Sequence, residues 1–291
     1  MRPLPILAAI LTLFVAAPHA EASPAPRFTA VVEGKGPDVI LIPGLASSAA
    51  VWDRTAERLK ATHRVHRIQV AGFAGFPVAG NGEGLVVAPL AEAIAGYMTK
   101  KKLARPAIIG HSLGGEAALM LAARHPGRIG RVMVVDALPF YSLLFNPAAT
   151  ADGIRPQADA MRDAVLGQTD AEAAAGAAAT LARMIKTETA RPAAIGWSRA
   201  SDRGVVARAV HELLTTDLRG ELGGIEAPLT VVYAYDEAYG VPAAMIDGLF
   251  RTAYSNAPGA TLQRIDDSFH FVMLDQPDAF ATAVDRFLAA R

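Results

Sequence analysis

The sequence contains no cysteine and carries no net charge, and each absence excludes a class of protein. Without cysteine there can be no disulfide framework, thiolate nucleophile, zinc–thiolate site or iron–sulfur cluster. The 28 basic and 28 acidic side chains cancel, so the chain lacks the basic surplus that nucleic-acid recognition normally requires. We therefore expect no nucleic-acid partner and a chemistry that rests on oxygen and nitrogen groups.

The chain is long and apolar enough to fold around a full core. It has 291 residues, of which 52% are hydrophobic and 19% are charged. This length suits one large domain, or a domain with an insertion, and the composition excludes a tail-like or disordered protein.

Residues 1–22 have the pattern of a secretory signal peptide. A basic start at Arg2 precedes an apolar run from Leu4 to Ala17, and Ala20-Glu21-Ala22 forms a small-x-small cleavage site. The alternative is an uncleaved membrane anchor, but the apolar run is shorter than the roughly 20 residues that cross a bilayer. We expect cleavage near Ala22, export to the periplasm or beyond the cell, and no stable membrane anchor afterwards.

Apolar runs that end in turn residues alternate with helical stretches along the rest of the chain. Continuous apolar runs of this kind are typical of strands buried on both faces of a parallel sheet. We expect an edge strand at 27–33 and buried strands at 39–42, 65–70, 107–110, 132–135, 229–233 and 261–265. We expect helices at 53–60, 88–100, 113–125, 241–254 and 278–290. This order predicts an α/β protein with a doubly wound, mostly parallel sheet.

Residues 137–224 interrupt this alternation, because they contain no strand-like run. Alanine-rich helical sequence dominates there, at 171–185 and 205–214. The segment is too long for an ordinary connection between strands, so we interpret it as a helical cap inserted between two core segments, 23–136 and 225–291. Such an insertion at the carboxyl edge of the sheet would cover the ligand site.

The sequence Gly110-His111-Ser112-Leu113-Gly114-Gly115 joins a predicted strand to a predicted helix. This is the G-x-S-x-G pattern in the strand-turn-helix setting of a nucleophile elbow. The sharp reversal strains the serine backbone, and glycines on either side let the neighbouring backbones approach. We predict Ser112 as the nucleophile and the Leu113 N–H as an oxyanion donor.

A serine nucleophile needs a histidine base and a carboxylate that orients it, in the chain order Ser, acid, His. His270 lies on the loop after the last predicted strand, and Asp236 follows the strand 229–233. Asp136, which ends the strand after the nucleophile helix, is the alternative acid. We prefer Asp236 because its place after the insertion matches the expected topology.

The loop after the first buried strand is expected to supply the second oxyanion donor. Its sequence is Pro43-Gly44-Leu45-Ala46-Ser47-Ser48, and Gly44 would let it turn close to the elbow. We assign this donor to the Leu45 N–H. The alternative is a simple turn that ends a strand.

Together these residues resemble the α/β-hydrolase family in its single-chain form with a helical cap. The resemblance covers about the whole mature chain: residues 43–52, the elbow, 231–236, and 270–277 with the closing helix 278–288. It implies a triad of Ser112, His270 and Asp236, with Leu45 and Leu113 as the oxyanion hole. The chain departs from many relatives at Pro43, where they have histidine, and in the loop 71–76, which lacks a frequent aspartate. These departures leave the substrate subfamily open and do not affect the triad.

Serine at the nucleophile position favours acyl transfer over the dehalogenase and epoxide hydrolase branches of the family, which use aspartate. The sequence has no nucleotide-binding or H-E-x-x-H motif, so we expect no cofactor and no metal. We predict an exported serine hydrolase that cleaves a small or medium, uncharged ester through an acyl-enzyme.

The substrate pocket is expected to be mainly apolar. Its predicted walls are the loop 72–87 and cap aromatics, namely Phe140, Tyr141, Phe145 and Trp197. Packing of these aromatics onto the core is the alternative. A peptidase, a lactonase, a carbon–carbon bond hydrolase and an acyltransferase could use the same triad, and a non-catalytic binding protein could keep the same fold. The expected partner is a small-molecule substrate, and the sequence leaves the oligomeric state open.

Overall fold

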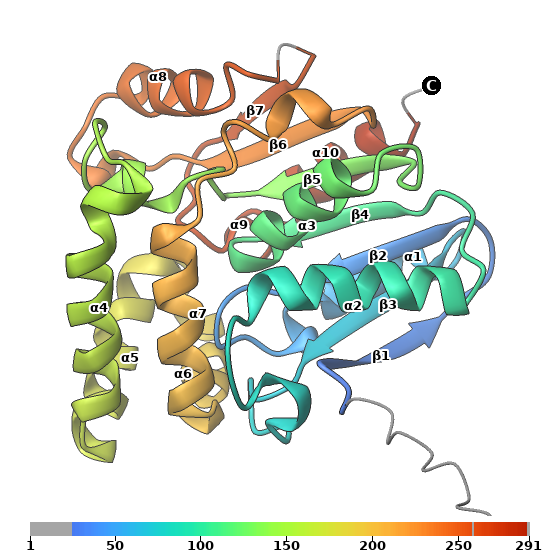
Figure 1. Cartoon of the computed structure of the whole chain (residues 1–291). Coiled ribbons are helices and arrows are strands. Elements are labelled where there is room, and N and C mark those ends of the chain that lie inside the picture. Colours follow the sequence, from blue (N-terminus) through green and yellow to red (C-terminus); the bar gives the residue numbers. More distant parts are fainter. Residues whose placement is uncertain (1–24, 258, 290–291) are drawn as a thin grey trace, which may run out of the picture.

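The computed structural model describes residues 25–257 and 259–289 (Figure 1). The predicted signal peptide, residues 1–22, lies outside this part. Within these two ranges, no helix is both long enough and apolar enough to span a membrane.

A seven-stranded sheet forms the centre of the molecule, with the strand order β1-β3-β2-β4-β5-β6-β7. Only β1 runs antiparallel to its neighbour β3, and the other paired strands are parallel. The predicted α/β class with a mostly parallel sheet is therefore confirmed. The strands are β1 (Phe28–Glu33), β2 (Asp38–Ile42), β3 (Arg64–Val70), β4 (Ala107–His111), β5 (Arg131–Val135), β6 (Leu229–Ala234) and β7 (Thr261–Ile265).

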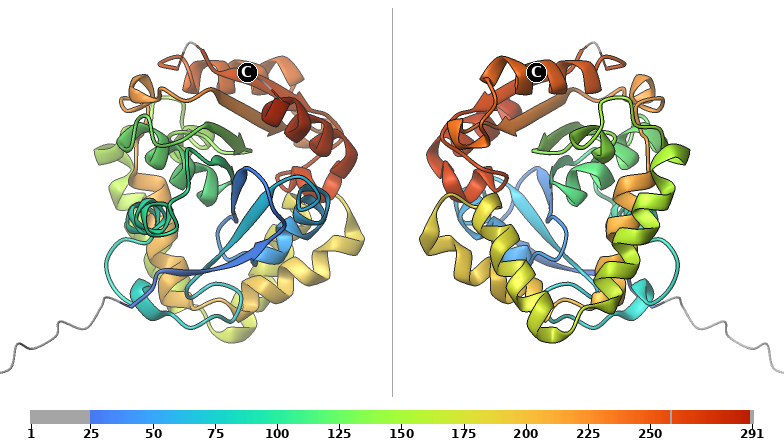
Figure 2. Two further views of the ribbon diagram at one scale, coloured as in Figure 1. Left: turned by 90° about the vertical axis from the view of Figure 1, so that its right-hand side faces the viewer. Right: turned by 90° about the vertical axis from the view of Figure 1, so that its left-hand side faces the viewer.

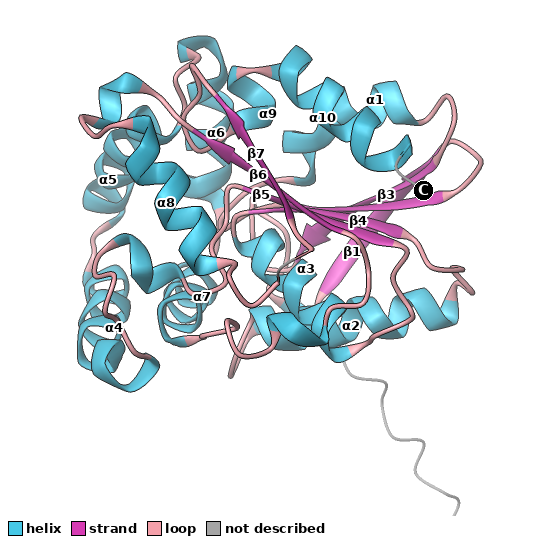
Figure 3. Cartoon of the chain, turned by 90° about the horizontal axis from the view of Figure 1, so that it is seen from above, coloured by secondary structure: helices cyan, strands magenta, loops and turns pink. Residues whose placement is uncertain are grey.

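Helices cover both faces of this sheet (Figure 3). On one face, α2 (Val87–Lys100), α3 (Leu113–Arg124) and α8 (Ala243–Ala253) share one buried apolar cluster with the strands. On the other face, α1 (Asp53–Leu59), the short α9 (Val272–Asp275) and α10 (Pro277–Ala289) share a second cluster. The central strand β4 is buried along its whole length, which explains its continuous apolar sequence.

The segment between β5 and β6 contains four α-helices and, within residues 136–228, no strand. These are α4 (Ala151–Gly167), α5 (Asp170–Met184), α6 (Arg191–Ala200) and α7 (Arg203–Thr215). They project from one end of the sheet, with α4 packed on α7 and α5 on α6, and the two pairs diverge in a V (Figures 1 and 2). Sequence reasoning located α5 and α7 but missed α4, whose interior holds Pro156, and α6.

One carboxylate joins this group of helices to the core. Glu212 on α7 accepts hydrogen bonds from the backbone N–H groups of Val86, Val87 and Ala88, at 2.6, 2.8 and 2.7 Å. These N–H groups lie at the start of α2, where no intrahelical acceptor is available and negative charge is favoured. Glu212 therefore caps a core helix from the inserted segment.

Candidate active site

Ser112 lies in the strained turn between β4 and α3, with φ of 52° and ψ of −122°. Gly110 and Gly114, two residues before and after it, have no room for a side chain. A Cβ on Gly110 would lie 2.0 Å from the Gly114 carbonyl oxygen, and a Cβ on Gly114 would lie 2.3 Å from the Ile42 carbonyl oxygen. The backbone therefore has the geometry that the G-x-S-x-G pattern predicted, with the serine at the carboxyl end of a central strand.

His270 is oriented by Asp136. The Nδ1 atom of His270 lies 2.7 Å from Oδ2 of Asp136, and both side chains are largely buried. Asp136 follows β5 directly and is itself fixed: its N–H donates to the Val232 carbonyl at 2.7 Å, and its Oδ1 accepts from the Ala234 N–H at 2.9 Å. Because a carboxylate only accepts, Nδ1 must carry the proton, which leaves the lone pair of Nε2 available as a base.

The prediction that Asp236 orients this histidine is wrong. Asp236 Oδ2 pairs with the Lys186 ammonium at 2.6 Å, and its Oδ1 accepts from the Ala238 N–H at 2.8 Å. The sheet order explains the difference, since β5 is the direct neighbour of the nucleophile strand β4 and β6 is one strand further away. Burial raises the pKa of the Asp236 carboxyl, but the hydrogen bonds from Lys186 and Ala238 outweigh it and hold that pKa below its ordinary 3.8.

The two predicted oxyanion donors lie in different segments, one in the loop after β2 and one at the start of α3. Leu45 follows β2 and Leu113 is the first residue of α3. Among the described residues, neither N–H is the donor of a backbone hydrogen bond in a turn, loop or cap, and Leu113 is too early in α3 to have an intrahelical partner. The close approach of the β2 loop to the elbow depends on Gly44, since a Cβ there would lie 3.1 Å from the Ser112 Cβ.

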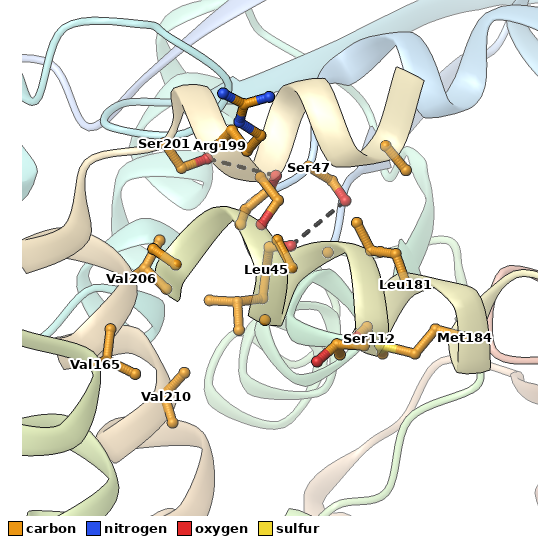
Figure 4. Close-up of a pocket in the computed structure, with 18 of the residues that line it drawn as sticks. Leu45, Ser47, Ser112, Val165, Leu181, Met184, Arg199, Ser201, Val206 and Val210 are labelled. Atoms are coloured by element: carbon orange, nitrogen blue, oxygen red, sulfur yellow. Dashed lines mark hydrogen bonds between the residues drawn. The ribbon is translucent and has the colours of Figure 1, made fainter. Parts of the chain in front are cut away.

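A cavity of about 880 Å³ lies between the sheet edge and the inserted helices. Ser112, His270 and Leu45 line it at the sheet edge, and apolar side chains of α4, α5 and α7 line it on the other side. Figure 4 shows Leu45 and Ser112 in the same space as these apolar residues, which include Val165, Leu181, Met184, Val206 and Val210. The cavity can hold an apolar group of medium size next to the serine.

The predicted pocket walls were partly wrong. Tyr141 and Phe145 line the cavity, but no residue of the loop 72–87 does. Phe140 is fully buried in the core, and Trp197 packs against the second apolar cluster. The loop 72–87 is instead covered by α7: a Cβ on Gly72 would lie 2.6 Å from the Val205 side chain.

Sequence reasoning named Tyr141 only as an apolar wall and gave Lys186 no role. Burial and the nearby Asp136 carboxylate raise the pKa of Tyr141 to about 12, partly offset by a hydrogen bond with Ser112. Its hydroxyl is therefore protonated at neutral pH and lies beside the serine. No sequence signal identifies Lys186, because its partner Asp236 is distant in the chain. In the two described ranges, no group of histidine and carboxylate side chains has the arrangement of a metal site.

Comparisons with known proteins bear on the family and the fold of the chain. A family model described as "Alpha/beta hydrolase family" matches residues 39–283. The pimeloyl-[acyl-carrier protein] methyl ester esterase of Aromatoleum aromaticum is 27% identical over 266 residues, which cover 86% of this chain and 97% of that protein. The enzyme of the same name from Aeromonas hydrophila is 33% identical over 108 residues, and that match spans only 41% of its length.

Solved structures show the same fold. A hydrolase from Pseudomonas aeruginosa PA01 superposes with a TM-score of 0.72 at 26% identity, covering 90% of this chain and 94% of that one. An esterase from Thermogutta terrifontis gives a TM-score of 0.74 at 17% identity, covering 90% and 92%. At that lower identity the likeness concerns the fold alone.

Proposed function

Since the chain belongs to the alpha/beta hydrolase family and is a hydrolase, we propose that it is an exported serine esterase acting on a small or medium, uncharged ester. The observation that carries this proposal is the hydrogen bond of 2.7 Å between His270 and Asp136 at the wall of the cavity that Ser112 lines. A nucleophile, a base and an orienting acid are the groups that acyl transfer requires.

The first half of the reaction forms an acyl-enzyme. The Ser112 Oγ attacks the ester carbonyl carbon while His270 Nε2 accepts the hydroxyl proton, and Asp136 stabilises the imidazolium that results. The carbonyl oxygen becomes an oxyanion that accepts hydrogen bonds from the N–H groups of Leu45 and Leu113. Collapse of this intermediate breaks the bond to the alcohol, which leaves with the proton from His270.

The second half releases the acid. A water molecule gives a proton to His270 Nε2 and attacks the acyl carbon through the same oxyanion site. The bond to the Ser112 Oγ then breaks, and the proton returns from His270 to that oxygen. The carboxylic acid leaves, and the serine hydroxyl is restored.

The cavity supports an ester with an apolar acyl or alcohol group. Its volume of about 880 Å³ and its aliphatic lining from α4, α5 and α7 favour an apolar chain of medium length. The names of the curated relatives specify a methyl ester, and we extend only their ester-cleaving chemistry to this chain. The protein carrier in those names is not part of the proposal.

Labelling with a fluorophosphonate tests the proposed nucleophile. The folded protein should react at one serine, and peptide mass analysis should locate the adduct on Ser112. Ser112→Ala and heat-denatured protein are the controls, and both should stay unlabelled. Absence of the adduct from folded wild-type protein would rule out the proposed mechanism, and a series of esters of increasing chain length would then define the substrate of a labelled enzyme.

Export is the second part of the proposal, and the pattern in residues 1–22 supports it. When the full chain is produced in a bacterium, N-terminal sequencing of the mature protein should give a start close to Ser23. The variant Ala22→Arg removes the small residue at the cleavage site and should remain uncleaved. Recovery of wild-type protein from the cytoplasm with its N-terminal segment intact would contradict export.

A further inference from the structure

His111 is a buried histidine that the proposed reaction does not use. It is the last residue of β4, directly before Ser112, and none of its surface is exposed. Its ring centroid lies 4.6 Å from that of His270 and 4.7 Å from that of Phe271. Its Nδ1 atom faces the oxyanion loop, because a Cβ on Gly44 would lie 2.9 Å from it. The ring therefore contacts two loops of the site, the one that holds His270 and Phe271 and the one that holds Gly44 and Leu45.

The hydrogen bond of His111 determines its tautomer. Nε2 lies 3.0 Å from the backbone carbonyl oxygen of His270, and a carbonyl oxygen only accepts, so Nε2 carries the proton. Nδ1 has no hydrogen-bond partner among the described residues. A second proton there would be an unpaired buried charge, and burial accordingly lowers the pKa of His111 well below its ordinary 6.5, with the neighbouring His270 as a further cause. The ring is a neutral, fixed donor.

Three successive residues of the catalytic loop are held through their backbones. The Phe269 N–H donates to Asp275 Oδ2 at 2.9 Å, the His270 carbonyl accepts from His111, and the Phe271 N–H donates to the Met184 carbonyl at 3.2 Å. Only the middle bond acts on His270 itself, and it comes from the residue next to the nucleophile. Ser112 and His270 are thereby connected through one rigid side chain.

We propose that His111 is a positioning residue that sets the His270 imidazole against Ser112 by donating a hydrogen bond to the His270 backbone carbonyl. This inference rests on the proposed function of Ser112 and His270. It assigns a role to the side chain between the glycine and the serine of the elbow motif. The physical reason is that a displacement of about 1 Å in a catalytic group costs about 100-fold in rate.

Three variants test the proposal by kinetics on an activated ester. His111→Leu removes the donor and should lower kcat by about 10- to 100-fold, because the bond holds the backbone of the proposed catalytic base. His111 also lines the cavity, so KM is measured in the same experiment. His111→Gln keeps an N–H donor of similar reach and should restore most of kcat. The matched control is His66→Leu: His66 is also buried, with its nitrogens 2.8 Å from the Tyr97 hydroxyl and 2.9 Å from Asp38, but it does not line the cavity. It should lose stability and keep kcat.

A magnetic resonance measurement separates this proposal from the proposed function. The proton on His270 Nδ1, bonded to Asp136, should give a downfield signal that is retained in His111→Gln and His66→Leu but exchanges rapidly in His111→Leu. If His111→Leu does not fold, His111→Asn, whose amide is too short to reach the carbonyl, takes its place. A normal signal and normal kcat in the variant without the bond would overturn the inference. The two proposals can also fail separately. If His111→Leu loses the signal but fluorophosphonate does not label the folded wild type, the positioning role of His111 is supported and the esterase is refuted.

Discussion

Two aspartates that follow neighbouring strands have different partners. Asp136 directly follows β5 and has φ of 47°, and its carboxylate connects His270 to the β6 backbone. Asp236, two residues beyond β6, is paired with Lys186 from the loop after α5. Both positions satisfied the sequence pattern of a carboxylate after an apolar strand. The choice between them depends on which strand lies next to β4 and on where Lys186 is placed.

Exchanging each carboxylate for its amide should separate the two roles. Asp136→Asn leaves the shape intact but allows the wrong tautomer of His270, so kcat should fall by about 10³- to 10⁴-fold on an activated ester. Asp236→Asn should leave kcat within about tenfold of the wild type, because His270 keeps its partner. Steady-state kinetics of the two purified variants measures kcat. A greater loss of kcat in Asp236→Asn than in Asp136→Asn would assign the role of the triad acid to Asp236.

At the scale of elements, two contacts between segments fix backbone groups in position. One is in the turn from β4 into α3, and the other is between α7 and the N-terminus of α2. The elbow brings Gly114 against the carbonyl groups of Ile42 and Pro43 on the neighbouring strand end. The α2 N-terminus receives its acceptor from Glu212, which lies far along the chain. The close approach at the elbow can be predicted from the glycines of the sequence motif. The Glu212 cap cannot, because Glu212 is distant in the chain from the residues that it contacts.

Adding one methyl group at the elbow should disrupt it. A Cβ on Gly114 would lie 2.3 Å from the Ile42 carbonyl oxygen, so Gly114→Ala should lower the free energy of unfolding by about 3 kcal/mol or more. The matched control is Gly96→Ala in α2, where nothing lies within 4 Å of the added Cβ. It should raise the free energy of unfolding by up to about 1 kcal/mol. Urea denaturation measures both, and equal effects would contradict the steric argument.

Removing the charge of Glu212 tests the join between α7 and α2. Glu212→Gln replaces one acceptor oxygen by a donor that faces N–H groups, and the free energy of unfolding should fall by about 1 to 3 kcal/mol. Glu221→Gln is the control, because Glu221 is paired with Arg124 at the surface, where such pairs contribute little. The two urea midpoints are compared at neutral pH. A control variant as unstable as Glu212→Gln would refute the capping role.

At the scale of the whole molecule, the inserted helices are attached to the core around the site. The last residue of α5 contributes the Met184 carbonyl to Phe271, and the loop after α5 contributes the Lys186 side chain to Asp236. Asp275 next to the catalytic loop accepts from the N–H groups of Lys186 and Thr187 at 3.0 and 2.8 Å. The cavity therefore has one wall from the core and one from the inserted helices. Its shape depends on the hydrogen bonds and the ion pair that hold these two parts together.

Acid should weaken this attachment. The folded-state pKa of Asp236 is lowered below 3.8, so its stabilisation is present above the unfolded pKa and is lost as pH falls through the folded pKa. The difference in unfolding free energy between the wild type and Asp236→Asn should be constant near neutral pH and shrink below about pH 4. Urea titrations at several pH values measure this difference. A difference that grows on acidification would contradict the sign.

The sequence alone determined the strands, most helices, and two of the three residues of the proposed triad. Apolar runs located the six strands β2 to β7, since buried parallel strands need such runs, and alternation located the antiparallel edge strand β1. The elbow was readable because its glycines, serine and flanking elements are contiguous, and His270 because it follows the last strand. Helix α4 was missed because its interior proline and polar residues obscure the pattern.

Only the tertiary structure decided the acid, the cavity walls and the partners of Asp236 and Glu212. Asp136 reaches His270 because parallel pairing sets β5 beside β4, and the pairing order is a property of the whole sheet. Lys186, Glu212 and His111 find partners far away in the chain, with His111 separated from its acceptor by 159 positions. Contacts at such separations arise from packing of the complete fold, and no local pattern records them.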